Sequence, residues 1–176
     1  MTAGHESEYR IRAMVMTALL AALACVATLV IRIPSPTGGY MNLGDTVVLL
    51  GAYLLGGGYG AAAGALGPAL ADLISGYPVY VPATLIIKAM MALLAAAIYH
   101  GCGRRVWSLV LASLAAEVLM VAGYWVYDSI LMGSMAGALA GVPSNAVQSV
   151  LGIAASTAIA SALRGVKPVR ERFPSL

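Results

Sequence analysis

Charged, amide and phenol side chains recur at helical spacing inside apolar segments of this chain. Glu117, Tyr124 and Asp128 lie at i, i+7 and i+11 of one segment, and Asn145 and Gln148 lie three residues apart in the next. Residues at these spacings share one face of an α-helix. A charge in hydrocarbon costs about 2.5 to 3.5 kcal/mol, so each such group needs a partner or a use. The pattern predicts a pocket that hydrogen-bonds a small polar molecule.

Lys88 adds a base to this set of polar residues. It follows Pro82 by six residues, which is roughly 9 Å along a helix from the outer end of its segment. Two interpretations stay open and do not exclude each other. Lys88 forms an internal ion pair with Asp72 or Glu117, or it contacts a bound ligand.

The sequence lacks the motifs of nucleotide-binding P-loop enzymes and of HExxH zinc enzymes. It contains neither a Gly-rich phosphate loop followed by Lys-Ser/Thr nor HExxH, and we expect no catalytic residue and no means of using ATP. Cys25 and Cys102 give neither a disulfide framework nor metal-ligand spacing, so no metal and no cofactor is expected. The net charge of +3 is dispersed along the chain, which argues against a nucleic-acid partner.

The segments that must position these side chains are apolar. Hydrophobic residues make up 61% of the 176 residues and charged residues 10%, against about a quarter charged in soluble domains. We therefore predict an all-α integral membrane protein, a single membrane domain over 1–176, with a disordered N-terminus (1–9) and a basic tail (165–176). Six transmembrane helices are expected, at about 11–31, 43–55, 61–75, 83–99, 107–127 and 143–163.

The basic residues predict the orientation of these helices. Six spans place both termini on the same side, and most Lys and Arg residues then fall on that side as well. Lys and Arg are in excess on the cytoplasmic side of membrane proteins. Both termini are therefore predicted to be cytoplasmic, with these basic residues beside them: Arg10, Arg12, Arg104, Arg105, Arg164, Lys167, Arg170 and Arg172.

Two further features lie near the start of the chain. A long loop after the first span carries Tyr40 and Asn42, which membrane insertion alone does not explain. On the first span Ala18 and Ala22 stand four residues apart and form a smooth face for close helix approach. Such a face packs either within the protein or against a partner subunit.

Two stretches resemble a known family. The run GGYMNLGDTVVLLGAYLLGGGYGAAAGALGPALADLISGYPVYVPATLIIKAMMALLAAAIYHG and the later VPSNAVQSVLG are similar to S components of energy-coupling factor (ECF) vitamin transporters. Within these, the riboflavin-type group is the most similar. The resemblance extends over nearly the whole chain, from about residue 12 to residue 163.

The resemblance implies a six-helix S-component bundle in a prokaryotic cell membrane, with both termini cytoplasmic. It implies a vitamin captured from outside, and docking onto a transmembrane T subunit with two ABC-type ATPases. The docking face maps to Ala18 and Ala22. The pocket candidates carried over by position are Tyr40, Asn42, Lys88, Glu117, Tyr124, Asn145 and Gln148.

The predicted lining contains tyrosines, amides, acids and one base, and few large aromatic side chains. It favours pyridoxine or hydroxymethylpyrimidine as cargo over the tricyclic riboflavin, which remains the alternative. Two other kinds of function stay open. The chain could be a stand-alone proton-coupled secondary carrier that uses Glu117 or Asp72, or a structural membrane protein whose buried charges only pair.

Overall fold

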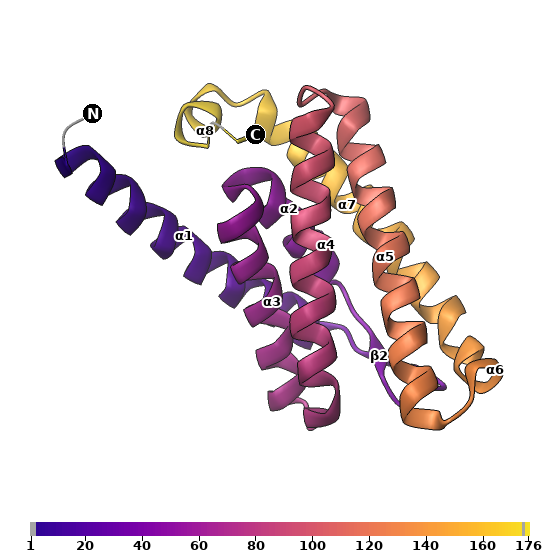
Figure 1. Ribbon diagram of the computed structural model, residues 1–176. Coiled ribbons are helices and arrows are strands. Elements are labelled where there is room, and N and C mark those ends of the chain that lie inside the picture. Colours follow the sequence, from indigo (N-terminus) through magenta and orange to yellow (C-terminus); the bar gives the residue numbers. More distant parts are fainter. Residues whose placement is uncertain (1–2, 174) are drawn as a thin grey trace.

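The computed structural model describes residues 3–173 and 175–176, and in this part of the chain each of the six predicted apolar segments is a helix (Figure 1). These helices are α1 (Ala3–Val30), α2 (Gly44–Leu55), α3 (Gly57–Ile74), α4 (Val81–Gly101), α5 (Val106–Met132) and α7 (Val142–Arg164). The short elements between and after them are β1 (Ile33–Pro34), β2 (Tyr40–Met41), η1 (Pro78–Tyr80), α6 (Met135–Ala138), η2 (Leu139–Gly141) and α8 (Lys167–Arg172).

Helix lengths differ from the predictions at both ends of the chain. α1 begins at Ala3, so residues 3–9, which we expected to be disordered, are helical. Part of the basic tail forms the short helix α8. α5 continues to Met132 and therefore contains Asp128, which could otherwise have been a solvated loop acid. Asp128 is instead buried, with 3% of its surface exposed.

Four segments of the described chain are long and apolar enough to cross a membrane by length and composition, namely 10–30, 78–101, 106–132 and 135–164. α2 is shorter, with 12 residues, or about 18 Å at 1.5 Å per residue. α3 follows it after the single residue Gly56, whose φ of 77° lies in a region that favours glycine. α2 and α3 therefore form a tight hairpin of helices inside the bundle.

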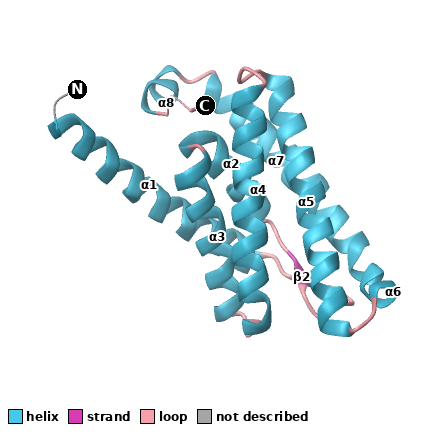
Figure 2. Ribbon diagram, viewed as in Figure 1, coloured by secondary structure: helices cyan, strands magenta, loops and turns pink. Residues whose placement is uncertain are grey.

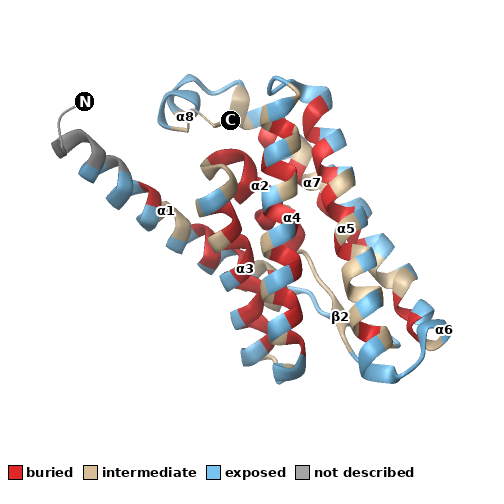
Figure 3. Cartoon of the chain, in the orientation of Figure 1, coloured by how far each residue is buried: buried red, intermediate tan, exposed pale blue. Residues whose placement is uncertain are grey.

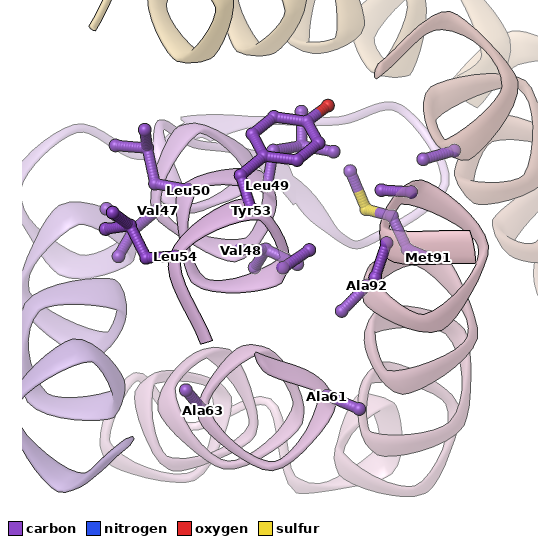
Figure 4. Close-up of a cluster of buried hydrophobic side chains, with 14 of the residues drawn as sticks. Val47, Val48, Leu49, Leu50, Tyr53, Leu54, Ala61, Ala63, Met91 and Ala92 are labelled. Carbon is purple, nitrogen blue, oxygen red and sulfur yellow. The ribbon is translucent and has the colours of Figure 1, made fainter. Parts of the chain in front are cut away.

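α2 is the centre of the core. Its residues Val48, Leu49 and Tyr53 are fully buried, and Figure 4 shows its side chains directed to several sides, with Val48 on the side of Met91 and Ala92 of α4. Glycine permits the close approach of the α2–α3 pair, because a Cβ atom at Gly60 would lie 2.7 Å from the Gly51 carbonyl oxygen. Small residues thus allow the backbones of α2 and α3 to pack closely together.

The long helices expose residues on their outward faces (Figure 3), and many of these are large and hydrophobic. Leu23 on α1, Ile86 on α4 and Ile130 on α5 are 51%, 61% and 72% exposed. A protein with such a surface is not stable in water but is compatible with a lipid environment. This surface agrees with a multi-pass membrane protein.

The two ends of the bundle differ in character. Both termini lie toward the end that carries the α4–α5 turn (Figure 1), and there the Arg164 guanidinium donates to the Arg104 carbonyl oxygen at 2.6 Å. The β1–β2 hairpin lies in the half away from α8 (Figure 2), and β2 contacts α7. The end of the bundle that carries the α4–α5 turn and α8 is therefore separate from the end that carries the β1–β2 hairpin.

Candidate functional site

A pocket opens beneath the β1–β2 hairpin, between the ends of α3, α4, α5 and α7. Its free volume is small, about 40 Å³, enough for a few water molecules. The lining is mostly polar: Ser35, Thr37, Gly39, Tyr40, Asn42, Asp72, Tyr80, Thr84, Tyr124, Asp128, Asn145 and Gln148. Five of the seven predicted ligand-binding residues are in this set.

The hairpin forms the roof of the pocket. Ile33 pairs with Met41 and Pro34 with Tyr40, and Gly38, with a φ of 93°, makes the turn possible. Ser35 and Ser144 share a hydrogen bond of 3.0 Å between their hydroxyls, which ties the roof to α7. Further bonds from this segment reach Asp72, Tyr80 and Gln148, so the roof is fixed to α3, η1 and α7.

Asp72 collects hydrogen bonds on one side of the pocket. The Tyr40 hydroxyl donates to Oδ1 at 2.6 Å and the Thr84 hydroxyl donates to Oδ2 at 2.5 Å. Thr84 also lies 3.0 Å from the Tyr124 hydroxyl, which donates to it because the Thr84 proton is already used. Burial and the Asp72 carboxylate raise the pKa of the Tyr40 phenol well above its ordinary value, so Tyr40 stays a hydrogen-bond donor.

Asp128 occupies a second side. The Tyr80 hydroxyl lies 2.9 Å from Asp128 Oδ1 and 3.2 Å from the Thr37 carbonyl oxygen. Within the described residues, Oδ2 of Asp128 accepts no hydrogen bond. A side chain at Gly141 would begin 3.2 Å from this oxygen, so the glycine leaves it uncovered.

Tyrosine rings form a continuous row near the pocket. Ring centroids are 4.9 Å apart for Tyr40 and Tyr77, 6.5 Å for Tyr77 and Tyr80, and 5.7 Å for Tyr80 and Tyr127. The row extends from the hairpin through η1 to α5. Tyr40 and Tyr80 of this row line the pocket, and their hydroxyls contact Asp72 and Asp128.

The amides have unequal roles. Gln148 Nε2 donates to Asp45 Oδ2 at 2.6 Å, and its Oε1 accepts from the Asn42 backbone N–H at 2.7 Å. The Asn42 side chain accepts from the Gly44 N–H at 2.8 Å and so forms an Asx turn just before α2. The Asn145 amide makes no hydrogen bond with the part of the chain that the structure describes and lines the pocket.

Lys88 and Glu117 lie behind the pocket rather than in its lining. The Lys88 ammonium pairs with Asp45, and the two side chains are 2% and 1% exposed. Internal pairing was expected with Asp72 or Glu117; the partner is Asp45 because α2 carries its first turn into the core. The Lys88 ammonium also lies 5.5 Å from the centroid of the Tyr124 ring.

Glu117 is wedged between α5 and α7. Neither of its carboxyl oxygens accepts a hydrogen bond from the described residues, and a Cβ atom at Gly152 would lie 2.4 Å from Oε1. The side chain borders an apolar groove between α5 and α7 on the outside of the bundle. A role for Glu117 or Lys88 in direct ligand contact stays a prediction.

Ala18 and Ala22 are on the outward face of α1, where both are exposed. Their neighbour Ala21 faces inward, and a Cβ atom at Gly67 of α3 would lie 2.4 Å from the Ala21 carbonyl oxygen. The inner face of α1 is therefore used in the bundle, while the Ala18–Ala22 face is free of contacts within the described chain.

Seven lining residues were absent from the predicted set: Ser35, Thr37, Gly39, Asp72, Tyr80, Thr84 and Asp128. Asp128 and Thr84 lie on the helical faces already identified from Glu117 and Lys88, so the spacing contained a signal for both. Tyr80 lies in a short 3-10 turn and has no such periodic signal. Its role depends on the bond to Asp128.

Comparisons with known proteins agree with this architecture. Residues 8–165 match the model of a family described as ECF-type riboflavin transporter, S component. A solved structure, the S component of a bacterial ECF transporter, superposes with a TM-score of 0.67 over 89% of this chain and 97% of that chain. Their sequences are 20% identical, so this similarity concerns the fold.

A curated relative from Pyrococcus woesei is described as an uncharacterized protein in gap 3'region. It is 37% identical over 132 residues, which is 73% of this chain and 85% of the relative. S components are the substrate-binding subunits of ECF transporters, which are multi-pass membrane assemblies of prokaryotes, and they are not an enzyme family. The chain belongs to the ECF-type riboflavin transporter S component family.

Proposed function

We propose that this S component captures a small hydroxylated heteroaromatic vitamin or precursor, such as pyridoxine or hydroxymethylpyrimidine, from outside the cell. The observation that carries the proposal is the polar pocket under the hairpin, at the end of the bundle away from the basic residues. An excess of Arg and Lys at the opposite end supports an outward-facing pocket. Hydroxyls, amides and carboxylates in the lining match a ligand rich in hydroxyls and ring nitrogens.

The size of the pocket supports a compact ligand. With a free volume of about 40 Å³, even a single-ring ligand requires the hairpin and the tyrosine side chains to move. A tricyclic ring requires a larger displacement of the same elements. Riboflavin remains the second candidate because the matching family carries its name.

Delivery is proposed to occur through a T subunit and two ABC-type ATPases. The smooth, outward-facing Ala18–Ala22 face supports docking of a T-subunit helix, since small residues let two backbones approach closely in a membrane. The proposed arrangement has both termini in the cytoplasm and the bundle spanning the membrane with six helices. The stand-alone proton-coupled carrier and the structural protein are the rival functions.

Native mass spectrometry of the detergent-purified chain, followed by a thermal-shift screen of B vitamins and precursors, tests the proposal. A ligand that binds only the folded state raises stability in proportion to the logarithm of its concentration over Kd. We expect one single-ring compound to bind with one-to-one stoichiometry. Co-purification of a yellow chromophore would identify riboflavin as the cargo instead. If no compound of the panel binds or shifts the melting temperature, the chain does not capture a vitamin. Proton-driven uptake by the chain alone in liposomes would favour the carrier.

A further inference from the structure

We propose that the pocket selects a ligand with a positively charged nitrogen, which pairs with the carboxylate of Asp128 beside the tyrosine row. This inference rests on the proposed function, because it concerns the same pocket. It adds the charge class of the ligand, which neither the family nor the fold specifies.

The first argument is the balance of charge. The residues lining the pocket include two acids, Asp72 and Asp128, and no Lys, Arg or His. The nearest base behind the lining is Lys88, and its charge is matched by Asp45 in a buried pair. An anionic ligand would therefore meet acids without a compensating base, whereas a cation would gain from the field of the pocket.

The second argument is the unequal hydrogen bonding of the two acids. Both oxygens of Asp72 accept a hydroxyl proton, from Tyr40 and Thr84. Asp128 has only 3% of its surface exposed. Within the described chain its carboxylate accepts a hydrogen bond only from the Tyr80 hydroxyl. The open oxygen of Asp128 is therefore the acceptor that a ligand donor would use.

The third argument is the tyrosine row, which is joined to the Asp128 carboxylate through Tyr80. Tyr80 holds Asp128 with its hydroxyl, and its ring lies 5.7 Å from that of Tyr127 and 6.5 Å from that of Tyr77. Ring faces attract cations, and clusters of them form the cages that recognise ammonium groups. Tyr80 thus connects the Asp128 carboxylate to the tyrosine row. A carboxylate and aromatic rings both favour a positively charged ligand.

A purely structural role for Asp128, as the anchor of Tyr80, is the competing explanation. A neutral acceptor would anchor the hydroxyl equally well. Asp128 has 3% of its surface exposed and no Lys, Arg or His beside it in the pocket lining, and a buried charge is costly unless something compensates it. The two explanations differ in one measurable respect, the dependence of affinity on ligand charge.

Three compounds that differ at one position of the same ring provide the test: pyridoxamine with an ammonium, pyridoxine with a hydroxyl and 4-pyridoxic acid with a carboxylate. Their Kd values are measured by calorimetry on the full chain in detergent, at low and high salt. We expect pyridoxamine to bind about tenfold or more tightly than pyridoxine, with a preference that shrinks as salt rises, and 4-pyridoxic acid to bind weakest.

The variant Asp128→Asn should abolish the preference for the ammonium compound over the hydroxyl compound, whatever its effect on the affinity for pyridoxine itself. Ser129→Ala, on the same helix with a hydroxyl bonded to the Trp125 carbonyl oxygen, is the matched control and should keep the preference. If Asp128→Asn does not fold, the ligand series and its salt dependence on the unmodified chain decide the question.

The outcomes separate the two proposals. Equal affinity for the ammonium and the hydroxyl compound, or tighter binding of the carboxylate, overturns the charge preference and leaves vitamin capture standing. Retention of the preference in Asp128→Asn overturns the role of this residue. Binding of none of the three compounds removes pyridoxine as the cargo and overturns the charge preference.

Discussion

Gln148 of α7 bonds with both its amide atoms to the start of α2, donating to Asp45 and accepting from the Asn42 backbone N–H. One side chain thus links the buried Lys88–Asp45 pair to the end of the hairpin that covers the pocket. The ligand pocket and the charged core are parts of one hydrogen-bonded network, which gives the following expectations.

Gln148→Ala should weaken ligand binding by about tenfold to a hundredfold, because it leaves the Asn42 N–H and Asp45 without their partners, at about 1 to 3 kcal/mol each. Hydrogen exchange of residues 33–42 should become faster in the ligand-free protein. Ser149→Ala, one position away on α7, is the control. Unchanged exchange in the hairpin would show that Gln148 does not restrain it.

Lys88→Met should destabilise the protein strongly, because removing one partner of a buried ion pair costs about 3 to 5 kcal/mol. The double variant Lys88→Met/Asp45→Asn should recover much of the loss, since it removes the second charge. Thermal unfolding in detergent, read by size-exclusion chromatography, measures both. A stable Lys88→Met protein that lacks only ligand binding would instead indicate that Lys88 contacts the ligand.

Gly152→Ala should be destabilising by about 1 to 3 kcal/mol, as expected for overpacking in a core. The new methyl group would meet Glu117 Oε1 at 2.4 Å without rearrangement. Adding Glu117→Ala should relieve the clash and raise the melting temperature of the double variant above that of Gly152→Ala. Gly58→Ala is the control, since a Cβ atom there has no neighbour within 4 Å. Equal stability of both glycine variants would contradict the close packing.

Ala18→Trp and Ala22→Trp should abolish co-purification with a T subunit without changing ligand affinity, because both positions are exposed in the isolated chain. Ile86→Trp places the same bulk on α4, at a position that is 61% exposed, and should leave the complex intact. If the α1 variants still form the complex, the docking face does not include Ala18 and Ala22.

Tyr40 should remain protonated when an ordinary tyrosine ionises. Its pKa is raised in the folded state, by burial first and then by Asp72. The hydrogen bond it donates therefore contributes fully to stability below about pH 10 and is lost only as the pH rises through the higher folded-state value. Between pH 8 and 10, the phenolate absorbance of the unmodified chain and of Tyr40→Phe should rise equally. A larger rise in the unmodified chain would mean that Tyr40 titrates normally.

The sequence alone determined the helices and the polar faces they carry. Hydrophobicity and helical spacing are local properties, so α1 to α5 and α7 begin and end within a few residues of the predicted segments, apart from the extra turns of α1 and α5. The same spacing placed Tyr124, Asn145 and Gln148 on inward faces. The family resemblance rested on the same stretches.

Only the tertiary structure decided which polar groups meet. Lys88 pairs with Asp45, 43 residues away, rather than with Asp72 or Glu117, and Tyr80 reaches Asp128 across 48 residues. These choices depend on how α2 inserts among its neighbours and how each helix is rotated, since a small rotation exchanges one facing side chain for the next. Spacing along one helix contains no information about the rotation of another, which is why Glu117 lies behind the pocket and Asp128 lies in it.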